Sequence, residues 1–320
     1  MKRSLAFAVM LACLPVVPAP AQDYPARTVR VVLPFPPGGG SDTIARLVTQ
    51  KLTGALGQPV VIDNRAGASG NIAGEIVAKS APDGYTLLFG NSSLSISPAV
   101  FQKLNYHPVN DLTPISMASS YPFALTVHPS LPVQSVKSLV ALAKSKPDAL
   151  AYASAGAGTM SHMAMELLRL RTGIKTQHLP YKGAAPASIS LISGETQLAF
   201  LVMPVAQVQA KAGKLRGLGV AAPERSPAMP ELPTMKEAGV PGHEAVQWNG
   251  FFAPARTPPA ILERLHREVA KAVHDPEVRK RIEAEGAAPS GSSPSEFAAF
   301  YRAEAEKWAE VAKKSGTKLD

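Results

Sequence analysis

The sequence contains very little cysteine. Cys13 is the single cysteine in 320 residues, and it lies within the first twenty positions. If that segment is removed during export, the mature chain has no thiol. We therefore expect no disulfide, no cysteine nucleophile and no thiolate metal site.

The sequence also lacks the common motifs of nucleotide-binding and hydrolytic sites. There is no G-x-x-x-x-G-K-[ST], no G-x-G-x-x-G and no G-x-S-x-G. His243-Glu244 is not followed by the second histidine of a zinc-protease helix, and the seven histidines are scattered without metal-ligand spacing. We expect no catalysis, no cofactor and no metal.

Charge of one sign is never concentrated in a block. The formal net charge is +9, and without Lys2 and Arg3 it is +7. Basic and acidic residues alternate along the last hundred positions. This pattern argues against nucleic-acid binding. A mildly positive field is compatible with attracting small anions, and equally with solubility.

The N-terminus has the three parts of an export signal. Met1-Lys2-Arg3 is followed by an apolar run, Leu5–Val17, and by the small-x-small sequence Ala19-Pro20-Ala21. We predict a signal peptide at 1–21, cleavage after Ala21 and a periplasmic mature protein. Two alternatives are a lipid anchor on Cys13, which the preceding Met-Leu-Ala fits poorly, and a buried N-terminal helix.

Strand and helix patterns alternate through most of the mature chain. In the first part, strands are expected at 28–35, 60–63 and 86–90, with helices from about 41 and at 72–80. A second series has strands at 151–154, 176–179, 196–202 and 217–220, with helices at 136–144, 161–171, 185–193 and 206–212. This rhythm is typical of parallel sheets covered by helices.

Two further apolar strands are expected at 120–128 and 245–252, each at a junction between the two series. Charged helices follow at 260–273, 276–285 and 294–315. We predict a two-lobed α/β fold, each lobe a mainly parallel sheet flanked by helices, with a ligand cleft between the lobes. The predicted boundaries are lobe 1 at 22–122, lobe 2 at 123–246, and a return to lobe 1 at 247–320.

Glycine-bearing turns follow strands in both predicted lobes. Ligands bind beyond the carboxyl ends of parallel strands, glycine lets the backbone approach closely, and a helix N-terminus favours an anion. A plain strand-to-helix turn is the alternative. The first-lobe candidates are Phe35, Pro37, Gly38, Gly39, Gly40, Ser41 and Asp42. The opposite candidates are Ser154, Gly156, Gly158, Thr159, Ser161 and His162. Polar residues after two other strands add Asn91, Ser92, Ser93 and Tyr181.

Five stretches form a joint pattern that covers the mature chain. They are Tyr24-Pro25 with Arg30–Asp42, then Val60–Ala68, Pro82–Leu88, Leu179–Gly183 and Gly250–Pro254. Together they resemble the Bug-type family, the substrate-binding subunits of tripartite tricarboxylate transporters. The resemblance implies a type II periplasmic-binding-protein fold, a hinge of two crossing strands, and capture of a carboxylate by lobe closure. It also implies a monomer that works with two membrane subunits. A sensor for signalling and a secreted hydrolase are the alternatives.

One departure from the family bears on the ligand. Many relatives carry an Asp-Asn pair shortly before the proline that corresponds to Pro204, whereas this sequence has Leu201-Val202-Met203. Met203 is included among the candidate contacts. Because a polar partner is missing there, we expect a carboxylate with a less polar body rather than an amino acid.

Overall fold

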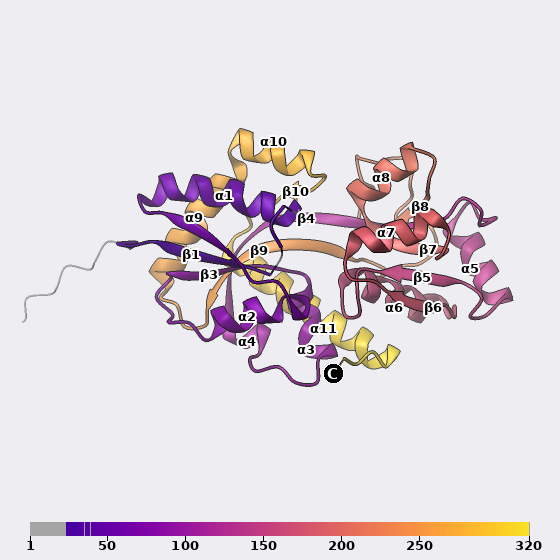
Figure 1. The fold of residues 1–320 in the computed structure, drawn as a ribbon, viewed down its shortest axis with the longest axis horizontal. Helices are drawn as coiled ribbons and strands as arrows, with labels where there is room; N and C mark the ends of the chain where they lie inside the picture. Colours follow the sequence, from indigo (N-terminus) through magenta and orange to yellow (C-terminus); the bar gives the residue numbers. More distant parts are fainter. Residues whose placement is uncertain (1–23, 35, 39, 320) are drawn as a thin grey trace, which may run out of the picture.

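The computed structural model describes residues 24–34, 36–38 and 40–319 (Figure 1). The predicted signal peptide with its cleavage after Ala21, the Cys13 anchor, and the site candidates Phe35 and Gly39 lie outside these residues. Within the described part of the chain, no helix is both long and apolar enough to cross a bilayer.

Lobe 1 begins with the expected alternation. Its elements are β1 (Val29–Leu33), α1 (Gly40–Leu56), β2 (Val60–Asn64), η1 (Ala68–Gly70), α2 (Asn71–Ala78) and β3 (Thr86–Asn91). β1 pairs in parallel with β2 on one side and β3 on the other. Ile44, Val48 and Leu52 of α1 recur at helical spacing and are fully buried in the core with β1. The carboxyl ends of these strands therefore meet at one edge, where α1 begins.

The chain enters a helix directly after β3. The sequence predicts a polar loop at Asn91–Ser93, but Asn91 ends the strand and α3 (Ser93–Val100) follows, then α4 (Pro108–Asp111). α3 is buried although it is rich in serine. Its hydroxyls are satisfied locally, since Ser95 and Ser97 donate to main-chain carbonyls one turn back.

Lobe 2 repeats the alternation. It contains α5 (Val136–Ser145), β5 (Ala151–Ser154), α6 (Met160–Thr172), β6 (Gln177–Pro180), α7 (Ala184–Ser193), β7 (Leu198–Val202), α8 (Met203–Lys211) and β8 (Arg216–Val220). β5 lies between β6 and β7 and is parallel to both. α6, α7 and α8 each follow a strand of this sheet, so their N-termini lie at its carboxyl edge.

Two long strands connect the lobes (Figure 1). β4 (Leu112–Val127) pairs antiparallel with β9 (Val246–Pro254) through Pro122, and with β7 from Phe123 onward. β9 also pairs with β3, so the strand order β2-β1-β3-β9-β4-β7-β5-β6 is continuous across the molecule. The register of β4 against β9 shifts twice, between Pro114 and Ser116 and between Met117 and Ser119. Such irregularities locally bend and twist a strand.

After β9, the chain returns to lobe 1. α9 (Pro259–His274) and α10 (Pro276–Ala284) pack near α1, β10 (Ala288–Pro289) pairs with β4, and α11 (Pro294–Ser315) ends the fold. α11 extends from lobe 1 toward lobe 2 (Figure 1). Phe297 and Tyr301 pack around Trp248 in lobe 1, with ring centroids 5.4 and 5.7 Å from the indole. Trp308 lies in the lobe 2 core, so α11 joins the two cores.

Candidate functional site

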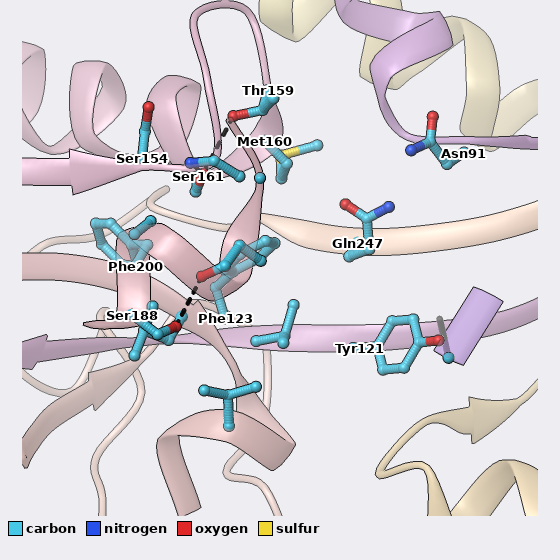
Figure 2. A pocket seen from close by; sticks show the side chains of 18 of the residues that line it. Asn91, Tyr121, Phe123, Ser154, Thr159, Met160, Ser161, Ser188, Phe200 and Gln247 are labelled. Atoms are coloured by element: carbon cyan, nitrogen blue, oxygen red, sulfur yellow. Dashed lines mark hydrogen bonds between the residues drawn. The ribbon is translucent and has the colours of Figure 1, made fainter. Parts of the chain in front are cut away.

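A cavity of about 560 Å³ lies between the lobes, and residues from both line it. Figure 2 shows Ser154, Thr159 and Ser161 on one side of it and Asn91 on the other, with Gln247 and Tyr121 on the two connecting strands. Seven of the predicted site residues line this cavity: Gly40, Ser41, Asn91, Ser93, Ser154, Thr159 and Ser161. The two predicted turns, one from each lobe, thus border the same space.

Three helix N-termini of lobe 2 border the cavity without a side-chain cap. The residues before α6, α7 and α8 are Thr159, Gly183 and Val202, and none of their side chains hydrogen-bonds into its helix. The first amides of a helix have no partner within it. Because they also carry the positive end of the helix dipole, these three starts favour an anion.

The lobe 2 hydroxyls are held by their own turn. Thr159 donates its hydroxyl proton to the Gly156 carbonyl at 2.7 Å, and its oxygen does not cap α6. The Ser161 oxygen accepts the Ala155 amide at 3.0 Å, and Ser154 hydrogen-bonds His178 at 2.7 Å. These contacts fix the hydroxyls at the cavity wall before any ligand enters.

Lobe 1 contributes polar side chains tied to the connecting strands. Ser41, at the start of α1, donates to the Asn249 carboxamide oxygen at 3.1 Å, and the Asn249 nitrogen donates to Ser119 at 3.3 Å. The Asn91 oxygen accepts the Ser93 amide at 3.2 Å, and Figure 2 shows its nitrogen on the side facing the cavity. Asn91 therefore presents a donor to a ligand.

Apolar side chains form much of the remaining wall, and apart from Leu201 and Val202 they were not predicted from the sequence. Phe123 comes from β4, Phe200 and Leu201 from β7, and Val205 from α8. Leu201 and Val202 stand where the sequence predicts a less polar ligand environment. Part of this group could have been predicted, because β7 and α8 form another strand-to-helix junction at the same sheet edge as the turns that were predicted.

Asp42, Gly38 and Pro37 do not line the cavity. Asp42 is buried and accepts hydrogen bonds from Arg46, Asn64 and the Gly38 amide. Burial raises the pKa of this carboxyl, but the three hydrogen bonds outweigh burial and hold it at about 2. Asp42 thus accepts a main-chain amide of the turn before α1 instead of contacting the cavity. Pro37 is exposed at the surface.

Three more predicted ligand contacts have structural roles and do not line the cavity. The buried Ser92 donates to Gln247 at 2.8 Å and so positions a residue that does line the cavity. Gly156 turns the chain with φ +134°. Gly158 has φ +73°, and a Cβ there would lie 2.7 Å from Leu319, so glycine permits close packing against the C-terminal segment.

His162, Tyr181 and Met203 also lie outside the cavity lining. The buried His162 accepts the Gly158 amide at 3.1 Å and stacks on His178 with centroids 4.0 Å apart. Burial lowers the pKa of His162 to about 4, so its ring is neutral and acts as the acceptor. The Tyr181 amide donates to the Ser154 main-chain carbonyl, and Met203 is buried in the lobe 2 core.

One charged residue of the lining has no local signal in the sequence. Glu285 follows α10 and reaches the cavity from the returning part of lobe 1. Among residues 24–34, 36–38 and 40–319, no cluster of histidine, cysteine, aspartate and glutamate is arranged to hold a metal.

The chain is similar to several known proteins. Protein BugT of Bordetella pertussis is 38% identical over 304 residues, which cover 94% of this chain and 93% of BugT. Among solved structures, R. palustris Rpa4515 with adipate has a TM-score of 0.81 and 37% identity over 93% of this chain and all of that one. MatC (Rpa3494) of Rhodopseudomonas palustris with bound malate has a TM-score of 0.79 and 34% identity, covering 90% and 99%.

The predicted family and fold are confirmed. A model of the tripartite tricarboxylate transporter family receptor matches residues 44–317. The members of that family are periplasmic receptors that bind solutes, among them small carboxylates, for tripartite transporters, and they are not enzymes. On this match and on the similarity to BugT, the chain belongs to the tripartite tricarboxylate transporter receptor family.

Proposed function

We propose that this protein binds one small carboxylate between its lobes and delivers it to the two membrane subunits of a tripartite tricarboxylate-type transporter. The observation that carries the proposal is the meeting of three uncapped helix starts, those of α6, α7 and α8, at a single cavity between the lobes. Such starts stabilise a negative group. The relatives solved with adipate and with malate support a carboxylate.

The wall composition supports a ligand with a less polar body. The carboxylate lies at the lobe 2 helix starts, and Phe123, Phe200 and Leu201 contact the rest of the molecule. Asn91 and Gln247 close the lobe 1 side. Each hydrogen bond to a charged group contributes about 1.5–3 kcal/mol. A few of them, less the cost of association, give micromolar affinity, about 8 kcal/mol.

Binding is tested by thermal unfolding with a panel of small carboxylates, each paired with its primary amide. A carboxylate present at about 100 times its Kd adds about 2.7 kcal/mol to the unfolding free energy. We expect stabilisation by at least one acid and none by its amide. If no acid stabilises the protein, or if each amide is as effective as its acid, the carboxylate proposal is wrong.

Export is part of the same proposal. We infer that the signal peptide 1–21 is removed after Ala21, and that the mature receptor is a periplasmic monomer. The intact mass of protein recovered from the periplasm tests this: it should correspond to a chain that begins at Gln22. A lipid-modified chain that begins at Cys13 would contradict the cleavage site.

A further inference from the structure

Glu285 is the one charged side chain among the described residues that line the cavity. It directly follows α10, in the segment that leads to β10. Its carboxylate is not matched by a lysine or an arginine in the cavity lining. A receptor proposed to bind anions thus has a negative charge in its own cavity. The position of this charge determines which ligand groups it repels.

The Glu285 carboxylate lies at the lobe 1 end, beside the start of α1. A Cβ placed on Gly40 would be 3.2 Å from Glu285 Oε2 and 3.9 Å from the Tyr121 hydroxyl. Nearby, Asp42 already accepts the Gly38 amide. Two carboxylates of the chain itself, those of Glu285 and Asp42, thus lie near the start of α1. The first turns of α6, α7 and α8 themselves contain no acidic residue.

Packing fixes the segment that carries Glu285. Gly286 has φ +72°, and a Cβ there would lie 2.2 Å from Pro204 Cγ. Pro204 is in the first turn of α8 and itself lines the cavity. The segment after α10 thus touches lobe 2, with Glu285 on the α1 side of the contact.

We propose that Glu285 selects ligands with a single carboxylate and excludes dicarboxylates. This proposal rests on the proposed function, in which the ligand carboxylate lies at the lobe 2 helix starts. A second carboxylate at the lobe 1 end would meet Glu285 in a cavity whose lining has no cationic side chain, and like charges at short range repel strongly. A neutral amide or hydroxyl at that end can donate a hydrogen bond to Glu285 instead.

The test compares each dicarboxylate from succinate to suberate with its monoamide, which has nearly the same shape and one charge less. Isothermal titration gives Kd for both ligands at the chain length that binds most tightly. In the wild-type protein, we expect the monoamide to bind at least about tenfold more tightly, about 1.4 kcal/mol. In Glu285→Gln, the two affinities should agree within about twofold.

Glu283→Gln is the matched control. Glu283 is two positions away in α10, is exposed and pairs with Arg279, and it does not line the cavity. This variant removes the same charge two positions earlier in the chain and should keep the wild-type preference. Equal melting temperatures of the three proteins without ligand show that folding is unchanged.

The outcomes separate the two proposals. If wild type binds the diacid as tightly as the monoamide, or if Glu285→Gln keeps the preference, charge selection by Glu285 is wrong and the receptor function stands. If Glu283→Gln loses the preference as well, the effect comes from overall charge, and the assignment to Glu285 fails. If no acid or monoamide binds, the proposed function is contradicted, and this inference with it.

Discussion

His178 supports Ser154 from behind the cavity wall. Its Nε2 lies 2.7 Å from the Ser154 hydroxyl, and its ring stacks against those of Tyr152 and His162, with centroids at 4.7 and 4.0 Å. Ser154 lines the cavity, whereas neither histidine does. A hydroxyl on the cavity wall is thus held by a side chain that does not itself line the cavity.

His178→Phe should keep the stacking and remove the hydrogen bond to Ser154. A lost neutral hydrogen bond costs about 1 kcal/mol, so we expect the free energy of unfolding to fall by about that amount. Carboxylate affinity should fall also, because the Ser154 hydroxyl is no longer held. Urea denaturation and isothermal titration measure the two effects. A variant with unchanged stability and affinity would show that the contact has no role.

The stability of the protein should fall as the pH drops from about 6.5 toward 4. Burial lowers the pKa of His162, His178 and His243 from the ordinary 6.5 to about 4. Between these values the unfolded chain binds protons that the folded chain does not, so acid favours unfolding. The slope approaches about 1.4 kcal/mol per pH unit for each histidine.

Urea denaturation at several pH values from 4.5 to 7.5 checks this dependence. The wild-type unfolding free energy should rise across that range and level off above about pH 7. His178→Phe should show a shallower rise, because one of the three groups is gone. A profile without slope between pH 4.5 and 6.5 would contradict the assignment of neutral buried rings.

Gly158→Ala should destabilise the protein more than Gly173→Ala. Both glycines have nearly the same left-handed backbone, with φ +73° and +72°. A left-handed conformation costs an alanine about 1–2 kcal/mol. At Gly173 nothing lies within 4 Å of the added carbon, whereas at Gly158 it would meet Leu319 at 2.7 Å and Val100 at 3.2 Å.

The difference in unfolding free energy between these two variants measures the cost of packing separately from that of backbone strain. We expect the free energy of unfolding of Gly158→Ala to be lower than that of Gly173→Ala by about 1–2 kcal/mol, the usual cost of overpacking. The urea midpoint, with an unchanged denaturant dependence, measures the difference. Equal midpoints would mean that the lobe 2 turn does not pack closely against α3 and the C-terminal segment.

Elements with local signals could be predicted from the sequence. The helix predicted at 294–315 matches α11, because Ser293 and Glu296 form a capping box and a proline follows the cap. The turns before α1 and α6 were found from their glycines and hydroxyls. Such features depend on neighbours in the sequence, and their meaning does not change with the tertiary structure.

Features that depend on distant contacts could not be predicted. α3 is missed because its buried serines break the apolar period, and their partners are main-chain carbonyls. Gly158 was interpreted as a ligand contact, but its neighbour Leu319 is far away in the sequence. Glu285 reaches the cavity only because the chain returns to lobe 1 after β9. Nothing near Glu285 in the sequence indicates this.

Ala184→Asp tests the central claim most directly, because it places a carboxylate at the first residue of α7, on the cavity wall. The new charge should fill the anion site and, as an acid at a helix start, stabilise the fold by about 0.3–1 kcal/mol. Isothermal titration should show carboxylate affinity reduced at least about hundredfold, about 2.8 kcal/mol, while Ala184→Asn stays within about fivefold of wild type. If the Asp variant binds carboxylates as tightly as the Asn variant, the ligand anion does not lie at these helix starts.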